Sequence, residues 1–277
     1  MVENVFVSRF RAIFRLSIYI CLTLTVVPTM LIAVSSRARL AIVLPKFYHQ
    51  LCLKTLGISI NTMGNPSSLK PTLFVSNHLS YLDIAIIGSL LEVSFIAKAE
   101  ISKWPIYGIL ARLTRTLFVE RRGSFVGSQR DAIAKRLFKG DNLVLFPEGT
   151  SADGRHVLPF KSSLFAVAEL HNEILPFQIQ PVSIAYTKLD GLPLDRFLLP
   201  YLAWYGDMTL VPHFFKLAGL GAITVEVKFH TPILSDQFKT RKELAEYCHQ
   251  IVSFGVASSN QGRKSKKPKG YTSAAFS

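Results

Sequence analysis

The chain has 277 residues, a formal net charge of +14 and a mean hydropathy of +0.30. This length is enough for one large domain or two small ones, and the composition excludes a disordered protein, a collagen-like fibre and a disulfide-rich scaffold. A nucleic-acid-binding protein this basic is normally hydrophilic. The combination therefore favours apolar membrane-seeking segments with a basic surface, the alternative being an apolar globular enzyme with a basic tail. The three cysteines, Cys21, Cys52 and Cys248, lie far apart and predict neither a disulfide framework nor a zinc site.

The N-terminal segment predicts a membrane anchor over residues 1–60. Residues 16–34 carry no charged side chain, which approaches the length of about 20 residues that spans a bilayer. Arginines flank this run on both sides, so the charge pattern does not set its orientation. The next stretch, residues 40–60, is only partly apolar and is expected to lie in the membrane interface. A cleaved signal peptide and a buried core helix are the alternatives.

Residues 61–71 are rich in turn-forming residues and are expected to mark a boundary. Beyond them, strand-like runs alternate with helical stretches. This alternation predicts an α/β domain over residues 61–255, with a mixed, largely parallel sheet flanked by helices. Strands are expected at 72–76, 93–97, 116–119, 142–146, 179–186 and 223–230, and helices at 83–91, 124–139, 160–171 and 237–254. The aromatic stretch 192–221 is interpreted as an interfacial region or, preferably, as an ordinary buried helix pair.

The C-terminal segment, residues 256–277, is predicted to be a disordered tail because it lacks apolar periodicity. Between residues 262 and 270 it carries lysines and an arginine but no acid. Each basic residue near a membrane surface contributes about 1 kcal/mol of attraction to anionic headgroups. A solvated tail without a specific partner is equally compatible with this composition. No recognition motif for nucleic acid accompanies the tail, so nucleic acid is not expected as a partner.

The segment Ser-Asn-His-Leu-Ser-Tyr-Leu-Asp, residues 76–83, lies between a predicted strand and a predicted helix. Side chains at such turns face ligands in α/β folds. Asp83 follows His78 by about one helical turn, so its carboxylate can accept a hydrogen bond from one imidazole nitrogen and leave the other as a base. Neither Ser76 nor Ser80 lies in a Gly-x-Ser-x-Gly elbow. Taken alone, this spacing leaves two interpretations open: a pair that activates a hydroxyl group of the substrate itself, and a helix-capping aspartate beside a surface histidine.

A second motif, Phe-Pro-Glu-Gly-Thr at residues 146–150, follows the predicted strand 142–146. Pro147 ends the strand, and Gly149 allows an unusual dihedral angle or a close backbone approach. Glu148 is thereby placed at the carboxyl end of a central strand, where ligands are usually bound. A turn with a solvated glutamate is the alternative interpretation.

These two motifs, together with Phe118-Val119-Glu120-Arg121 and Gln180-Pro181-Val182, resemble the glycerolipid acyltransferase superfamily. The resemblance is greatest to the bacterial 1-acylglycerol-3-phosphate (lysophosphatidate) acyltransferases and covers residues 70–190 best. It implies that His78 is the general base and that Asp83 orients it. It implies substrate-binding roles for Asn77, Lys98, Arg121, Glu148, Gly149 and Thr150, with Lys161 as a weaker candidate. It implies no metal and no cofactor, since acyl-CoA or acyl-acyl carrier protein is a co-substrate.

One residue departs from the pattern of lysophosphatidate acyltransferases. Many of them have arginine after Glu-Gly-Thr, whereas this chain has Ser151. Residues 151–165 and 202–208 resemble the branch that includes lyso-ornithine lipid O-acyltransferases. Acylation of 1-acyl-sn-glycerol-3-phosphate to phosphatidate is thus the main expectation, and acylation of lyso-ornithine lipid is the alternative. Two less favoured alternatives are a non-catalytic membrane-surface protein and a hydrolase that uses the same pair on water or through Ser80.

The resemblance also implies where the protein works and what it meets there. The partners expected are membrane lipids, a lysophospholipid acceptor, and CoA or acyl carrier protein carrying the acyl chain. The location expected is the inner membrane of a bacterium, with the catalytic domain on the cytoplasmic side.

Overall fold

The computed structural model describes residues 6–35, 40–105, 107–120, 126–170 and 176–262. The predicted tail begins inside the last helix, and from residue 263 onward it lies outside the described residues. The helices are α2 (Arg9–Ser35), α3 (Leu40–Leu56), α4 (Leu82–Leu90), α5 (Tyr107–Leu113), α6 (Val126–Phe138), α7 (Leu210–Ala218) and α8 (Arg241–Asn260), with the 3-10 helices η1 (Ala99–Lys103), η3 (Ser162–Glu169), η4 (Leu199–Tyr201) and η5 (Ser235–Gln237).

Within the described residues, nine strands form one sheet whose main path runs β1-β8-β6-β2-β5-β3-β4. The strands are β1 (Ile58–Met63), β2 (Thr72–Ser76), β3 (Ser94–Lys98), β4 (Leu117–Val119), β5 (Leu143–Leu145), β6 (Gln178–Leu189), β7 (Leu192–Pro193), β8 (Ile223–Phe229) and β9 (Ile233–Leu234). The strands from β6 to β4 along this path are parallel, whereas β8 is antiparallel to β6 and parallel to β1. The predicted mixed, largely parallel sheet with flanking helices is confirmed.

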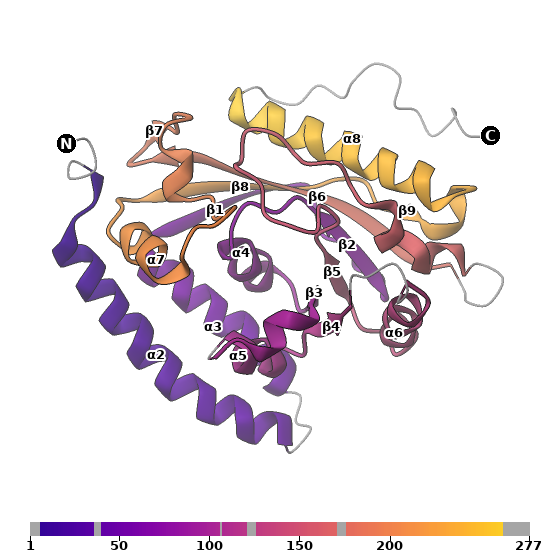
Figure 1. Ribbon diagram of the computed structural model, residues 1–277, viewed down its shortest axis with the longest axis horizontal. Helices are drawn as coiled ribbons and strands as arrows, with labels where there is room; N and C mark the ends of the chain where they lie inside the picture. The colour runs from indigo at the N-terminus through magenta and orange to yellow at the C-terminus, as the bar shows by residue number, and fades with distance from the viewer. Residues whose placement is uncertain (1–5, 36–39, 106, 121–125, 171–175, 263–277) are drawn as a thin grey trace.

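Helices cover both faces of the sheet (Figure 1). Phe74 of β2 packs into a core with α3, α4 and α7, whereas its neighbours Leu73 and Val75 pack into a second core with α6, η3 and α8. This alternation follows from the two-residue period of a strand, and β2 is buried on both faces because it lies in the middle of the sheet. The central strands are therefore rigid, and they fix the position of the residues that follow their carboxyl ends.

The six strands expected from the sequence all exist, with ends that differ by a few residues. The segment expected to be an α-helix at 160–171 is instead the 3-10 helix η3. Residues 164–168 of this helix are all buried, so its hydrophobic pattern has no solvent-facing period that would distinguish one helix type from the other. The stretch 192–221 contains η4 and α7. Within it Leu202 and Leu217 are buried, whereas Phe197 and Val211 are exposed.

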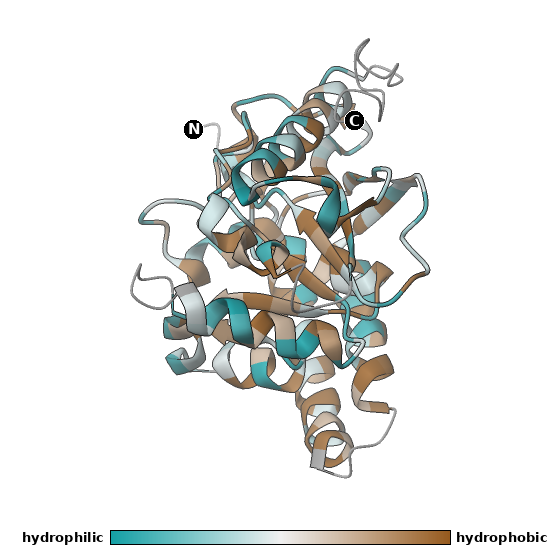
Figure 2. Ribbon diagram, turned by 90° about the vertical axis from the view of Figure 1, so that its right-hand side faces the viewer, coloured by the Kyte–Doolittle hydropathy of each residue, from teal (hydrophilic) through white to brown (hydrophobic). Residues whose placement is uncertain are grey.

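Helix α2 is a candidate membrane anchor. It is long and apolar enough to cross a bilayer, and only 11% of its most hydrophobic 18-residue window is buried. Its exposed side chains include Phe10, Leu24 and Ile32. The end of the molecule where α2 finishes and α3 begins is mainly hydrophobic (Figure 2). Such an apolar surface is typical of contact with lipid.

Helix α3 and strand β1 belong to the packed α/β layers, although residues up to 60 were expected to form the anchor. Helix α3 buries His49, Cys52 and Leu53, and it packs on α2 and α4. Strand β1 crosses the expected boundary at residue 60 and pairs with β8 along its whole length. The division of the chain into an anchor, a catalytic domain and a tail stays a prediction.

The N-terminal end of α2 is joined to the end of α7 by hydrogen bonds. Nη1 of Arg15 donates to the carbonyl oxygens of Ala218 at 3.2 Å and Leu220 at 2.7 Å. The amide of Ser8 donates to the carbonyl of Gly219 at 2.9 Å. A cationic side chain is favourable there because the last carbonyls of a helix lack partners within the helix and carry a partial negative charge. Helix α2 is therefore docked on the domain rather than tethered to it.

Candidate active site

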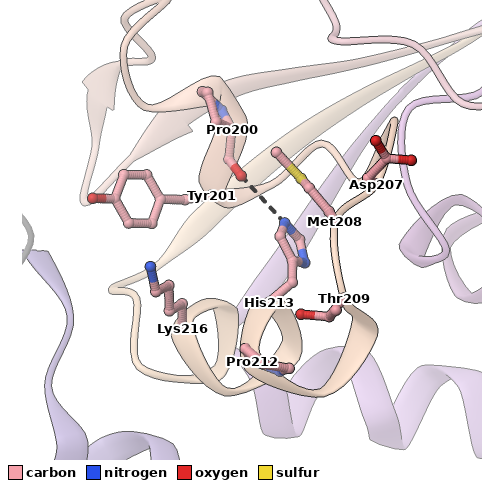
Figure 3. Close-up of a pocket in the computed structure, with 8 residues that line it drawn as sticks. All are labelled: Pro200, Tyr201, Asp207, Met208, Thr209, Pro212, His213 and Lys216. Atoms are coloured by element: carbon pink, nitrogen blue, oxygen red, sulfur yellow. Dashed lines mark hydrogen bonds between the residues drawn. The ribbon is translucent and has the colours of Figure 1, made fainter.

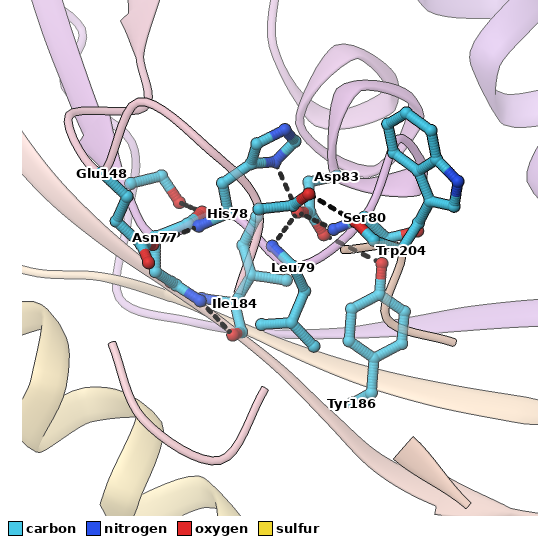
Figure 4. Close-up of polar contacts among 11 residues, drawn as sticks. Asn77, His78, Leu79, Ser80, Asp83, Glu148, Ile184, Tyr186 and Trp204 are labelled. Atoms are coloured by element: carbon cyan, nitrogen blue, oxygen red, sulfur yellow. Dashed lines mark hydrogen bonds and ion pairs between the residues drawn. The ribbon is translucent and has the colours of Figure 1, made fainter. Parts of the chain in front are cut away.

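The two sequence motifs meet at one edge of the sheet. His78 follows β2, and Glu148 follows β5, which is the neighbour of β2 in parallel register. Because parallel strands end at the same edge, both side chains lie in the region where open α/β sheets bind their ligands. Figure 4 shows these residues with the groups that hold them.

His78 and Asp83 form the predicted pair. Nδ1 of His78 lies 2.9 Å from Oδ2 of Asp83. The side chain of Asp83 is fully buried, whereas that of His78 keeps 21% of its surface exposed. An ionised carboxylate only accepts hydrogen bonds, so this contact favours the tautomer with its proton on Nδ1. Nε2 is then left unprotonated, as the sequence predicted for a base.

The backbone just before α4 fixes the Asp83 carboxylate. Oδ2 accepts hydrogen bonds from the backbone amides of Leu79 at 2.6 Å and Ser80 at 2.9 Å. Backbone amides that donate to a carboxylate form strong, charge-assisted hydrogen bonds. Asp83 therefore has a structural role as the cap of the turn and a second role as the partner of His78.

Tyr186 completes the surroundings of Asp83. Its hydroxyl donates to Oδ1 of Asp83 at 2.9 Å (Figure 4). Burial, and then the nearby Asp83 charge, raise the pKa of Tyr186 well above its ordinary value, so this phenol stays protonated. The sequence analysis missed this residue. The signal was a tyrosine at the end of the strand predicted at 179–186, which could be placed only by knowing that β6 pairs with β2.

The ring of His78 is also held by stacking. Its centroid lies 4.2 Å from that of Phe146, with 20° between the planes. Phe146 is the first residue of the Phe-Pro-Glu-Gly-Thr motif and is almost fully buried. The imidazole is thus fixed by a hydrogen bond at Nδ1 and by a rigid aromatic surface on one side.

The carboxylate of Glu148 binds the backbone of the site. Oε1 accepts the His78 amide at 2.7 Å and Oε2 accepts the Leu158 amide at 2.9 Å. Glu148 is 2% exposed. Its pKa is raised to about 7, mainly by burial; the amides of His78 and Leu158 oppose this shift, and the nearby Asp83 charge adds to it. In this arrangement Glu148 holds the loop that presents His78.

Asn77 connects β2 to β6 where their ladder ends. Its Nδ2 donates to the carbonyl of Ile184 at 2.9 Å, and its Oδ1 accepts the Ile184 amide at 2.8 Å. The side chain is 1% exposed. The amide therefore imitates one more pair of strand hydrogen bonds and fixes the position of the residue before His78.

The loop after Glu148 folds back over the catalytic turn. Gly149 has a φ of 74°, a conformation that glycine adopts at little cost. The amide of Ala152 donates to the carbonyl of His78 at 2.8 Å. Ser151, which stands where many lysophosphatidate acyltransferases have arginine, donates its hydroxyl to the carbonyl of Trp204. Thr150 is exposed.

Of the three predicted cationic residues, two are exposed and one lies outside the described residues. Lys98 ends β3 at the same edge of the sheet and is exposed. Arg121 lies outside the described residues. Lys161 is exposed, and its backbone amide donates to the carbonyl of Pro147 at 2.9 Å.

The serines of the catalytic turn are not placed as nucleophiles. The hydroxyl of Ser80 is buried and has no hydrogen-bond partner among the described residues, while Nδ1 of His78 is engaged by Asp83. The hydroxyl of Ser76 donates to the carbonyl of Asn77. In the part of the chain that the structure describes, no three His, Cys, Asp or Glu side chains come together as a metal site.

Comparison with known proteins agrees with this geometry. Residues 58–185 match the family model described as Acyltransferase. The chain is 41% identical over 226 residues to the lyso-ornithine lipid O-acyltransferase of Brucella abortus, a match that covers 80% of this chain and 84% of that protein. The chain belongs to the acyltransferase family. It is an enzyme, as the sequence motifs predicted.

Other members of the acyltransferase family are also similar. The lyso-ornithine lipid O-acyltransferase of Rhizobium meliloti is 36% identical, with 84% of this chain and 82% of that protein covered. The 1-acyl-sn-glycerol-3-phosphate acyltransferase of Neisseria gonorrhoeae is 32% identical, with 70% and 71% covered. The crystal structure of the 1-acyl-sn-glycerophosphate acyltransferase PlsC from Thermotoga maritima matches with a TM-score of 0.57 at 22% identity, covering 80% of each chain, which shows a shared fold.

Proposed function

We propose that this acyltransferase transfers a fatty acyl chain to the free hydroxyl of lyso-ornithine lipid. The observation that carries the acyl-transfer step is the orientation of His78 by the buried Asp83. The choice of acceptor is supported by the relatives from Brucella abortus and Rhizobium meliloti, which are more similar to this chain than the lysophosphatidate enzyme of Neisseria gonorrhoeae. Ser151 in place of a phosphate-binding arginine supports the same acceptor. Of the two acceptors expected from the sequence, the second is therefore favoured.

In the proposed reaction, Nε2 of His78 takes the proton of the acceptor hydroxyl while the hydroxyl oxygen forms a bond to the thioester carbonyl carbon. The C–S bond of the tetrahedral intermediate then breaks, and the leaving thiolate takes the proton from the imidazolium. The products are the acylated lipid and the free thiol of CoA or of acyl carrier protein. Asp83 stabilises the positive charge that His78 carries between these two steps. A positioned base of this kind contributes about 10²–10⁴-fold to the rate.

The described residues that the sequence assigned to substrate binding have three different roles in this proposal. Asn77 and Glu148 act through the backbone, because their side chains hold Ile184 and the amides of His78 and Leu158. Lys98 and Thr150 are exposed near the carboxyl edge and contact the substrates. Gly149 sets the path of the loop through its positive φ.

The proposal places the enzyme on the inner membrane, with the catalytic domain on the cytoplasmic side where the thioester donors are found. The candidate anchor α2 is exposed along its apolar length, and its docking on α7 keeps the site close to the lipid. An acceptor that stays in the bilayer then meets a base held at its surface.

The test is an assay of the full chain reconstituted in phospholipid vesicles. Lyso-ornithine lipid and lysophosphatidate are offered in parallel, each with acyl-CoA and with acyl-acyl carrier protein, and products are identified by mass spectrometry. We expect acylated ornithine lipid from the wild-type protein and a loss of at least about 10²-fold in kcat for His78→Ala, with an unchanged melting temperature.

Two outcomes would contradict the proposal in different ways. A clear preference for lysophosphatidate would overturn the acceptor and leave the acyl transfer intact. Full activity of the His78→Ala variant, or release of free fatty acid without an acceptor, would overturn the role of His78 as the base for acyl transfer.

A further inference from the structure

A pocket lies beside the turn that carries His78, between α7 and the loop that precedes it. Its volume is about 460 Å³. Figure 3 shows the side chains around it. They are Pro200, Tyr201, Asp207, Met208, Thr209, Pro212, His213 and Lys216. None of these residues has a part in the chemistry assigned to His78 and Asp83.

Two contacts attach this pocket to the turn that carries His78. Nδ1 of His213, in the pocket wall, lies 3.0 Å from the hydroxyl of Tyr81. The amide of Trp204 donates to the carbonyl of Leu79 at 2.9 Å. Both Leu79 and Tyr81 are within three residues of the catalytic histidine. A ligand in the pocket is thereby held beside that turn.

The side chain of His213 has both nitrogens engaged. Nε2 lies 3.2 Å from the carbonyl oxygen of Pro200, which only accepts hydrogen bonds. Nε2 therefore carries the proton, and Nδ1 accepts the hydrogen bond of Tyr81. The imidazole is a fixed, neutral part of the wall, so the charges of the pocket come from other residues.

Those charges are of opposite sign and stand at opposite ends of the pocket. Asp207 lies in the loop before α7, and Lys216 lies in the last turn of that helix. Figure 3 shows the carboxylate and the ammonium on different sides of His213 and Met208. Both charged residues are exposed, so a ligand can reach them from solvent or from the lipid interface. Such a pocket is complementary to a zwitterion whose two charges are joined by a short apolar chain.

We propose that Asp207 and Lys216 bind the ornithine headgroup of the acceptor. The δ-ammonium of ornithine pairs with Asp207, its α-carboxylate pairs with Lys216, and its methylene groups lie against Met208 and Pro212. This inference rests on the proposed function, since it names the residues that select that acceptor. The acyl hydroxyl, on the other side of the ornithine amide, extends from the pocket toward His78.

The same pocket disfavours a lysophosphatidate headgroup. A phosphate monoester is anionic and has no ammonium group to pair with Asp207. Lys216 could pair with the phosphate, but Asp207 would then lie unpaired beside a second anion, and like charges brought together at a binding site lower affinity for the wrong partner. The pocket thus contributes to selectivity both by pairing with one headgroup and by repelling the other.

The test measures KM and kcat of the full chain in vesicles for wild type, Asp207→Asn and Lys216→Gln. The matched controls are Asp131→Asn and Lys135→Gln, the same changes at exposed positions of α6. We expect each pocket variant to raise KM for lyso-ornithine lipid about tenfold, the effect of losing one charge-assisted contact, with kcat within about twofold of wild type. The controls are expected to match wild type.

Acceptor analogues separate direct contact from a structural effect. On an analogue whose carboxylate is converted to an amide, Lys216→Gln should cause no further loss relative to wild type. On an analogue whose δ-amine is acetylated, Asp207→Asn should cause no further loss. Such a cycle between a protein group and a ligand group isolates their interaction.

Each outcome decides one question. Suppose that wild type acylates lyso-ornithine lipid, but the pocket variants have the wild-type KM or show the same increase in KM on every analogue. The headgroup site is then wrong and the proposed function stands. If wild type does not acylate lyso-ornithine lipid, both are wrong.

Discussion

The hydroxyl of Tyr186 donates a hydrogen bond to Oδ1 of Asp83, 2.9 Å away and 103 residues earlier in the chain. Together with His78 and the amides of Leu79 and Ser80 on Oδ2, it leaves the buried carboxylate surrounded by donors. A carboxylate held by donors on both oxygens has a fixed orientation. The orientation of the base therefore depends on strand β6 as well as on its own turn.

The first prediction removes this contact. Tyr186→Phe should lower kcat about tenfold, a small part of the about 10²–10⁴-fold supplied by a general base, because Asp83 orients His78 less firmly. It should also cost about 1–3 kcal/mol of stability, since Oδ1 is left buried without this donor. The matched control is Tyr48→Phe, which deletes another buried hydroxyl, 2.8 Å from the hydroxyl of Thr23 in α2. The control should lose stability but not kcat, and equal kcat values for both variants would contradict the role of Tyr186.

A second prediction concerns the link between Asn77 and Ile184. In Asn77→Asp one carboxylate oxygen still accepts the Ile184 amide, but the other faces the Ile184 carbonyl in a fully buried place. We expect a loss of about 3–5 kcal/mol in the free energy of unfolding at pH 8. Burial raises the pKa of the new carboxyl, so the loss should shrink at pH 5, where the protonated group can donate to the carbonyl.

Asn77→Ala is the comparison for this prediction. It removes both hydrogen bonds without adding a charge, so its stability deficit should be the same at the two pH values. Urea unfolding in detergent at pH 5 and pH 8 measures both variants. Equal deficits of the aspartate variant at the two pH values would show that the carbonyl of Ile184 does not face that group.

A third prediction follows from the raised pKa of Glu148. Its folded-state pKa is about 7 against an ordinary value of 4.5, so the folded protein favours the protonated form. The stability that this group contributes is fully present below about pH 4.5 and is lost as the pH rises to about 7. The loss amounts to about 3 kcal/mol at 1.36 kcal/mol per pKa unit.

Glu148→Gln does not titrate and supplies the reference for that measurement. The difference in unfolding free energy between wild type and Glu148→Gln should fall by this amount between pH 4.5 and pH 7 and then stay level. The variant also loses one of the two amide contacts, to His78 or Leu158, which adds an offset independent of pH. A difference that does not change with pH would refute the buried state of Glu148.

The fourth prediction tests the docking of α2. Arg15→Ala removes the hydrogen bonds to the carbonyls of Ala218 and Leu220 and should lower the melting temperature in detergent, with a stability loss of about 1–2 kcal/mol. Arg9→Ala is the control, because Arg9 is an exposed arginine of the same helix. Among the described residues, it makes no hydrogen bond to α7 like those of Arg15. Identical melting temperatures of the two variants would mean that the contact with α7 contributes nothing to the fold.

The sequence motifs predicted the local half of the site. His78 and Asp83 are five residues apart, so the tight turn that leads into α4 brings them together, and their contact was predictable from spacing. The strand preceding each motif was recognisable because its residues are apolar and are followed by turn-forming residues. The fold class followed from the alternation of strands and helices.

The other half of the site depends on contacts between distant segments. Tyr186 and Ile184 reach the catalytic turn only because β6 pairs with β2 in one register, and no local pattern specifies that register. In the same way, the apolar stretch before residue 60 looked like membrane anchor, although its second half packs against α4 and joins the sheet. Apolar composition does not distinguish contact with lipid from contact with a protein core.

Phe214 of α7 touches Tyr19 of α2 on one side and Tyr81 of the catalytic turn on the other, with ring centroids 5.2 and 5.8 Å apart. One aromatic ring therefore separates the candidate anchor α2 from the turn that carries His78. In the proposed arrangement, with α2 in the bilayer, this packing fixes the depth of His78 relative to the lipid. Under that proposal, an acceptor can react only if its hydroxyl reaches the same depth.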